Sequence, residues 1–283
     1  MDSAPEIHAN ETLIGQEPQT LAALDRAFEL RGVGQLDAAK TELEKALDRA
    51  RLMPGETDFR DRVELAMTLA DFYKEAGTPQ KAREVLAAEV SYAEEEYRKV
   101  RATGTPTEKR EVMTGLTVLR DHHAQIALIG QTAPEISVKH WINSDPITLT
   151  DLRGYVVLLE FWATWCKPCQ RMFPKIKELY QDYAARGLRV LALTRHYFAD
   201  RANAGSQESE LELIRGYVRD HGLEFPVGVA EDARTQLLYG AVGVPVLALL
   251  DRQGVVRCYG HFDADHSDPE FDEVLRRCLD EPA

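Results

Sequence analysis

The chain has 283 residues, of which 44% are hydrophobic and 29% charged, and its formal net charge is −13. This length favours two domains over one and supplies enough apolar material for a sizeable core. The acidic balance argues against a nucleic-acid-binding protein, because a phosphate-binding surface needs clustered lysine and arginine. No apolar run approaches the roughly 18 residues of a membrane-spanning helix.

The first residues, MDSAPEIHANETLIGQEP, contain neither the basic segment nor the apolar segment of a secretory signal peptide. Taken literally, this start predicts no export. A mature chain whose signal has been removed could start in the same way, so the sequence leaves the compartment open. We expect residues 1–17 to form a flexible segment ahead of the first domain.

Residues 18–129 have a helical pattern throughout. Apolar residues three and four positions apart predict about five amphipathic helices, separated by glycine and proline. In the first of these, Leu21, Leu24 and Phe28 are expected on the core side. Paired helices joined by short turns suggest helical hairpins, and the segment is therefore predicted to be an all-helical domain.

Two windows of this helical region resemble each other, and they begin at Ala39 and Ala82. Their offset is 82 − 39 = 43 residues, whereas a tetratricopeptide repeat has about 34. A degenerate tetratricopeptide-like repeat therefore stays open, and a plain helical bundle is favoured over it.

The histidine-rich places do not indicate a metal. His122 and His123 are adjacent on the fifth predicted helix and point about 100° apart, which suits one ion poorly. The run HFDADH at 261–266 mixes histidine and carboxylates but is expected to be a solvated turn. We expect neither a metal nor a separate cofactor.

Short β-branched runs alternate with helical runs over residues 130–283. EISVKHW and ITL are expected to pair as a hairpin. YVVLLEF is an almost continuous apolar strand, as in a sheet covered on both faces. The remaining runs predict a helix from Cys166 with Pro174 inside it, then strand, helix, strand and short helix, a closing hairpin and a last helix. The pattern predicts a central mixed sheet with helices on both sides.

Cys166 and Cys169 lie where the apolar strand gives way to the next helix. The first turn of a helix offers unpaired N–H groups and the positive end of the helix dipole, and Lys167 adds a cation. These features favour a thiolate at Cys166, which is expected to have a lowered pKa and to attack. Cys169 is expected to be more buried and to resolve the mixed disulfide. Pro168 suits the first helical turn, where its missing N–H costs nothing.

Glu160 is the only charged residue in YVVLLEFWATW. A buried, unpaired carboxylate is costly and its pKa rises, which suits a group that exchanges a proton with the resolving thiol near neutral pH. A solvent-facing position for Glu160 is the alternative.

Other chemistries fit the cysteines less well. A zinc site needs four ligands, and Cys258 and Cys278 do not form a second closely spaced pair. An inert structural pair is equally disfavoured. A peroxidase of the peroxiredoxin type would need Thr or Ser three residues before its cysteine, where this chain has Ala163. Cys258 and Cys278 are expected to be two buried free thiols, and a second disulfide between them is the alternative.

Three segments together carry a family resemblance: GQTAPEISV with ITLTDLRGYVVLLEFWATWC, then FWATWCKPC, then YGAVGVPVLALLDRQGVV. They resemble the thioredoxin-like superfamily, and within it the TlpA/ResA-like thiol–disulfide oxidoreductases. The resemblance covers about residues 130–283. It implies a thioredoxin-like α/β fold behind the helical domain of residues 18–129.

The resemblance also implies roles for single residues. Pro245 is implied to be the cis-proline that faces the two cysteines, and the backbone of Val244 to pair with an extended partner segment. Trp165 matches the surface tryptophan beside the active site, and Glu160 matches the buried acid of thioredoxin. The chain departs from the pattern at Val246, where threonine is usual, in the insertion RHYFADRANAGSQESE, and in the helical N-terminal half.

The resulting hypothesis is a thiol–disulfide oxidoreductase that reduces protein disulfides, with the Cys166–Cys169 pair as its own redox group. The helical domain would dock a partner or form a homodimer, and the electron donor is not indicated. Family resemblance implies a periplasmic or otherwise extracytoplasmic place. The helix terminus and Lys167 favour an oxidant, whereas buried Glu160 favours a reductant, so a thiol oxidase stays open. An interaction scaffold with a vestigial thioredoxin-like domain is the alternative from another functional class.

Overall fold

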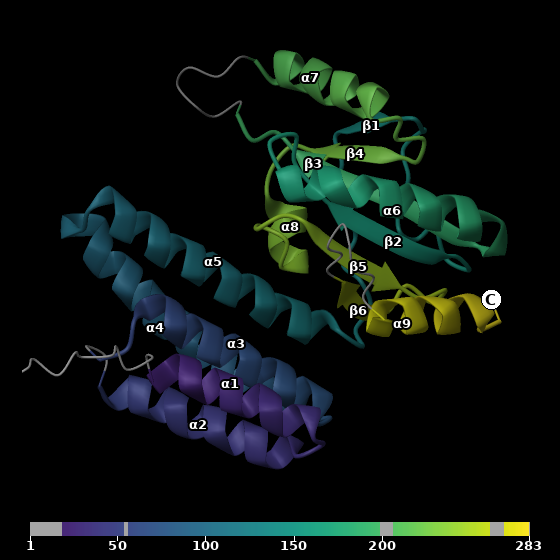
Figure 1. Ribbon diagram of the computed structural model, residues 1–283. Helices are drawn as coiled ribbons and strands as arrows, with labels where there is room; N and C mark the ends of the chain where they lie inside the picture. Colours follow the sequence, from purple (N-terminus) through teal and green to yellow (C-terminus); the bar gives the residue numbers. More distant parts are fainter. Residues whose placement is uncertain (1–18, 54–55, 199–205, 261–268, 283) are drawn as a thin grey trace, which may run out of the picture. The chain divides into compact units, whose positions relative to one another are not determined.

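The computed structural model describes residues 19–53, 56–198, 206–260 and 269–282 (Figure 1). The chain forms two compact units, residues 1–85 and 86–283, and the division falls inside helix α4 (Pro79–Thr103). The predicted flexible segment 1–17 lies outside the described residues. Within the described ranges, none of the helices combines the length and the apolarity needed to cross a bilayer.

The first unit is helical. It contains α1 (Gln19–Gly32), α2 (Leu36–Leu52) and α3 (Phe59–Glu75), which pack against one another. Asp58 begins α3 as its N-cap, accepting a hydrogen bond from the Arg60 N–H, and so supplies one of the partners that a helix start lacks. The buried side chains at the centre of this packing are Leu24, Ala27, Leu43, Leu47, Leu65, Leu69 and Phe72.

The core side of α1 was predicted only in part. Leu24 is buried as expected, but Leu21 and Phe28 are 42% and 49% exposed, and Ala27 takes the central buried position instead. Contact with α2 and α3 buries only the middle of the apolar stripe, because a helix packs along a narrow seam. Phe28 at the margin still meets Phe72 edge-on, with 5.6 Å between ring centroids.

The second unit includes α5 (Pro106–Leu128), which begins with a complete capping box. Thr105 accepts a hydrogen bond from the Glu108 N–H, and the Glu108 carboxylate accepts one from the Thr105 N–H. Pro106 follows in the first turn, where no partner for an N–H is needed. These residues fix where α5 starts, and its other end packs against α8 (Arg234–Tyr239).

One mixed sheet forms the centre of this unit, in the strand order β1-β4-β3-β2-β5-β6. The strands are β1 (His140–Ile142), β2 (Val156–Phe161), β3 (Leu188–Arg195), β4 (Val227–Ala230), β5 (Val246–Leu250) and β6 (Val256–Gly260). β2, β3 and β4 are parallel, and β1, β5 and β6 run against their neighbours. Because β2 lies near the middle, all six of its residues are buried.

The two faces of β2 belong to two different apolar clusters. Val156 and Leu158 face the side covered by α6 (Lys167–Tyr183), α7 (Gln207–Asp220) and α9 (Pro269–Asp280), whereas Val157 and Leu159 face the side that holds Tyr239 of α8 (Figure 1). This alternation follows from the two-residue period of a strand. A short 3₁₀ turn, Ala184–Arg186, links α6 to β3. The predicted mixed sheet with helices on both sides, behind a helical N-terminal region, is confirmed.

The predicted hairpin between EISVKHW and ITL is wrong. The first of these supplies β1, but β1 pairs antiparallel with β4, with His140 opposite Val229. The second is a turn, in which the Asp151 carboxylate accepts hydrogen bonds from the N–H and hydroxyl of Thr148, and Glu135 accepts one from the Leu149 N–H. Side chains therefore satisfy the donors that a strand partner would have used.

Candidate active site

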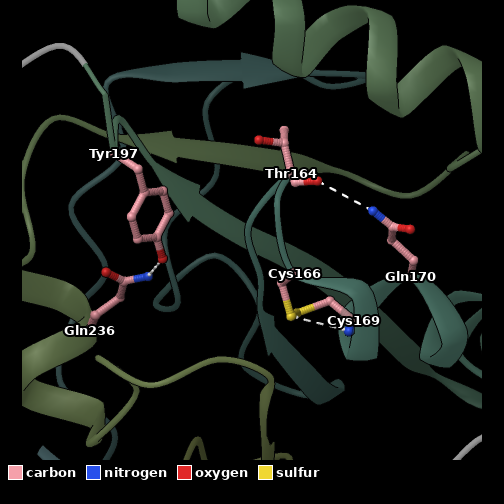
Figure 2. Close-up of a disulfide and its surroundings, with 6 residues drawn as sticks. All are labelled: Thr164, Cys166, Cys169, Gln170, Tyr197 and Gln236. Carbon is pink, nitrogen blue, oxygen red and sulfur yellow. Dashed lines mark hydrogen bonds between the residues drawn. A yellow bond between two sulfur atoms is a disulfide. The ribbon is translucent and has the colours of Figure 1, made fainter. Parts of the chain in front are cut away.

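The two cysteines stand at the start of α6, directly after the loop that follows β2. Cys166 is the N-cap of this helix, and its sulfur accepts a hydrogen bond from the Cys169 N–H at 3.1 Å (Figure 2). The two sulfurs form a disulfide with an S–S distance of 2.04 Å. Both residues are buried, Cys166 at 2% and Cys169 at 0% exposed. The helix terminus therefore directs an N–H group at the sulfur that was expected to attack.

Lys167 and Pro168 follow in the first turn of α6, and both are exposed. Pro174 lies inside the same helix, as expected from the sequence. On the N-terminal side, Ala163 is fully buried and offers no hydroxyl to the cysteines. In the first turn of α6, the Lys167 ammonium is therefore exposed to solvent, whereas the disulfide is buried.

Glu160 is fully buried in β2, and neither of its carboxylate oxygens has a hydrogen-bond partner among the described residues. The solvent-facing alternative for this side chain is therefore wrong. Its neighbours Leu158 and Trp162 point to the apolar cluster that contains both cysteines, and the strand alternation places Glu160 on that same face. Burial raises the pKa of Glu160 well above its ordinary value.

Two further polar groups share this region. The indole N–H of Trp162 is buried and lacks a partner among the described residues, and the Tyr217 hydroxyl is buried near the Gln170 side chain. The two rings lie 5.2 Å apart between centroids. Burial raises the pKa of Tyr217 to about 12; a hydrogen bond with Gln170 lowers it, and the charge of Glu160 raises it further. The carboxyl group therefore sits in an environment with little compensation for a negative charge.

Val244 and Pro245 come directly before β5, and the peptide bond between them is cis. Val246, the first residue of β5, pairs with Phe161, the last residue of β2. This register brings the start of β5 beside the end of β2 that leads to Cys166. Val244 is half-buried and packs against the apolar cluster that contains both cysteines.

Trp165, which the family resemblance had named, contacts a group of side chains that the sequence reasoning missed. Trp165 is 52% exposed and meets Tyr197 edge-on, with 5.4 Å between ring centroids. The guanidinium of Arg195 lies 4.1 Å from the centre of the Tyr197 ring. Gln236 donates a hydrogen bond to the Tyr197 hydroxyl at 2.7 Å (Figure 2). It also accepts one from Arg195 at 2.6 Å. The available signal was an Arg and a Tyr at the end of a buried strand, in a stretch that had been treated only as an insertion.

Cys258 on β6 and Cys278 on α9 are not joined by a disulfide, so the alternative of a second disulfide is wrong. Cys278 is buried as expected, whereas Cys258 is only half-buried. Burial raises the pKa of Cys278, which suits an inert core thiol. The loop 261–266 lies outside the described residues. In the described part of the chain, no group of three or more side chains gathers that could hold a metal ion.

The similarity to known proteins lies within this second unit. A sequence model of the AhpC/TSA family matches residues 129–259. The thiol-disulfide oxidoreductase ResA of Bacillus thuringiensis strain Al Hakam is 33% identical over 128 residues, which cover 45% of this chain and 66% of that protein, slightly under two thirds of it. ResA of Bacillus thuringiensis subsp. konkukian is 31% identical over 149 residues, covering 53% of this chain and 78% of that protein.

Among solved structures, a thiol-disulfide isomerase from Corynebacterium glutamicum is 23% identical, with a TM-score of 0.43. The match covers 53% of this chain and 97% of that one. The sequence similarity to ResA, over more than two thirds of a relative, matches the resemblance expected from the motifs around Cys166 and Pro245. The chain belongs to the thioredoxin-like family of ResA-type thiol–disulfide oxidoreductases.

Proposed function

We propose that this chain is a thiol–disulfide oxidoreductase that reduces disulfides of a partner protein through Cys166 and Cys169. The observation that carries the proposal is the cysteine pair at the N-terminus of α6, packed on the face of β2 that also holds a fully buried carboxyl group without a partner among the described residues. Membership of the family supports it. The described disulfide is the oxidised end of the cycle.

In the proposed reaction, the Cys166 thiolate attacks one sulfur of the partner's disulfide. A bond forms between Cys166 and that sulfur, and the other partner sulfur leaves as a thiolate that takes a proton. The Cys169 N–H, which donates to the Cys166 sulfur at 3.1 Å, stabilises negative charge there. Cys166 is thus the nucleophile, and Lys167 in the same helical turn favours its ionised form.

The second step releases the partner. Glu160 takes the proton of the Cys169 thiol, and the Cys169 thiolate attacks Cys166. The Cys166–Cys169 disulfide forms, and the partner's second sulfur leaves as a thiolate that takes a proton from solvent, so two electrons have passed to the partner. Glu160 suits this role because burial raises its pKa towards the range in which a carboxylate accepts a proton from a thiol. An external dithiol must then reduce the pair again.

The opposite direction is the second candidate. The N–H donated to the Cys166 sulfur stabilises the reduced form, as in an oxidant. The buried carboxyl group disfavours a nearby thiolate, as in a reductant. We favour the reductant because Glu160 is fully buried and lacks a compensating hydrogen bond among the described residues.

Further parts of the proposal concern the whole chain. The partner segment is proposed to lie extended against the backbone of Val244, with Trp165 and Pro245 on either side. The helical region 18–129 would dock a protein partner or a second copy of this chain, ahead of a thioredoxin-like domain of residues 130–283. Residence outside the cytoplasm is proposed from the family.

Insulin reduction with dithiothreitol tests the activity. We expect the wild type to accelerate the reaction, and Cys166→Ser to abolish the acceleration because the nucleophile is lost. Cys169→Ser should instead accumulate a mixed disulfide with the substrate. A wild type no faster than Cys166→Ser would leave the interaction scaffold as the better description.

Redox titration of the pair against glutathione or dithiothreitol settles the direction. A reduction potential near about −270 mV fits a reductase, and one near about −120 mV fits a thiol oxidase. We expect a value close to the first.

A further inference from the structure

Helix α5 is bonded to the loop that leads into the cis-proline. The carboxylate of Asp121 accepts a hydrogen bond from the Gly243 N–H at 2.8 Å and one from the Val242 N–H at 3.3 Å. One turn further on, Gln125 donates from its side-chain amide to the Gly240 carbonyl at 2.6 Å. Both side chains are buried, at 8% and 7% exposure. Positions four apart on a helix lie on the same face, so the two act together.

The contact between helix and loop is close. Gly240 has a φ of +59°, and a Cβ at this position would lie 2.2 Å from the backbone oxygen of Asp121. Only glycine therefore allows the approach. Burial raises the pKa of Asp121, whereas the hydrogen bonds from Gly243 and Val242 lower it. The pKa of Asp121 is raised overall, and both of its carboxylate oxygens accept hydrogen bonds from the loop.

The loop so held is the one that positions the docking backbone. Gly243 is followed directly by Val244 and by the cis bond to Pro245, and β5 then begins at Val246. With the Val242 and Gly243 N–H groups and the Gly240 carbonyl bonded to α5, the peptide plane that enters Gly243, one residue before Val244, is fixed. A free loop would have to lose this freedom each time a partner bound.

We propose that Asp121 and Gln125 are positioning residues, which hold loop 240–243 so that the Val244 backbone is ready to pair with the disulfide-bearing segment of a partner protein. This rests on the proposed function. α5 lies outside the segment that matches the AhpC/TSA family. Helix α5 would thus support the docking loop from outside the family-matching segment.

The test compares Asp121→Asn with a matched control in the full chain. An asparagine can still accept from one amide, but its NH₂ group faces the other donor and breaks the second bond. The control is Asp251→Asn, at the opposite end of β5. Asp251 is 1% exposed; one of its oxygens accepts from the N–H groups of Gln253 and Val255 in the turn after β5, and the other pairs with the Arg257 guanidinium at 2.6 Å. The asparagine can keep the two amide bonds and loses the charged contact with Arg257, so the control also removes a buried carboxylate interaction, far from the docking loop.

Three quantities are measured for each variant: amide hydrogen exchange at Val242 and Gly243, reduction of insulin by the pre-reduced protein as a function of insulin concentration, and reaction with the small disulfide of hydroxyethyl disulfide. For Asp121→Asn we expect exchange of the two amides to speed up at least about tenfold and the KM for insulin to rise about tenfold. Reaction with the small disulfide, and the equilibrium with glutathione, should change less than about twofold. Asp251→Asn should leave all these quantities near the wild type and lower only the stability.

Unchanged exchange and an unchanged KM in Asp121→Asn would overturn the proposal. So would equal losses with insulin and with the small disulfide, because these indicate general damage to the site. Gln125→Glu, which sets a carboxylate against the Gly240 carbonyl, should repeat the pattern of Asp121→Asn. A wild type no faster than Cys166→Ser would overturn the proposed function itself, and the docking role with it, whatever the exchange rates.

Discussion

At the scale of single residues, Glu160 is the most costly group of the candidate site. It is a carboxyl group in a central strand, fully buried and without a partner among the described residues. Burial raises its pKa well above the ordinary 4.5. Between pH 4.5 and the folded pKa, the folded chain holds a proton that the unfolded chain has released. Stability therefore falls as the pH rises through this window, and is highest below the unfolded value.

The substitution Glu160→Gln should separate this cost from the function. Because burial raises the pKa of Glu160, its charged form costs stability at high pH, and we expect the variant to be more stable than the wild type at pH 8. The difference should vanish near pH 4.5. Insulin reduction at pH 7 should slow at least about tenfold, because the proton acceptor of Cys169 is lost. Urea unfolding of the oxidised forms at both pH values, with turnover assays, measures the two effects.

A control for this prediction is Glu210→Gln. Glu210 is also buried, at 6% exposure, but accepts hydrogen bonds from the N–H groups of Tyr197 and Phe198. Replacing it should destabilise the fold by about 1–3 kcal/mol. If Glu160→Gln were destabilising to the same extent at pH 8, the assignment of Glu160 as an uncompensated acid would be wrong.

At the scale of elements, α6 and α5 support the site from two different sides. The start of α6 follows from the sequence, because a cysteine pair after an apolar strand and a proline in the first turn mark a helix beginning. The contact of α5 with loop 240–243 does not. Asp121 and Gln125 lie near the end of a long amphipathic helix, and nothing local marks Gly240 as their partner, 115 residues further along the chain from Gln125.

Substitution of two glycines measures this contact directly. Gly240 and Gly222 have similar left-handed backbones, with φ of +59° and +57°. A Cβ on Gly240 meets α5, whereas a Cβ on Gly222 meets nothing within 4 Å. We expect Gly222→Ala to cost about 1 kcal/mol of backbone strain, and Gly240→Ala at least about 2 kcal/mol more. Equal losses in urea unfolding would show that α5 does not press on this loop.

At the scale of the whole molecule, the family-matching segment 129–259 and the compact unit 86–283 do not coincide. The unit starts earlier because α5 contributes to it. The resemblance alone suggested a boundary near residue 130, since sequence similarity records the shared fold and not what a particular chain has packed onto it.

A comparison of two shortened chains tests this. Residues 86–283 retain α5, whereas residues 130–283 lose the partners of the Val242 and Gly243 amides and of the Gly240 carbonyl. Because water replaces these partners, the loss should be modest, about 1–3 kcal/mol. This corresponds to a melting temperature lower by about 3–10 °C for the shorter chain. Identical melting temperatures would mean that α5 adds nothing to the stability of the thioredoxin-like domain.

The amino-acid sequence by itself determined the cysteine pair, its place at a helix start, the apolar strand with one acid, and the mixed sheet. These follow from local periodicity and from spacings within a few residues of Cys166. Only the tertiary structure decided that Glu160 is buried without a partner among the described residues, that β1 pairs with β4, that Cys258 and Cys278 form no disulfide, and that Asp121 bonds to loop 240–243. Each of these depends on which distant segments meet, and the energies that choose between partners belong to the packed core rather than to any short stretch of chain.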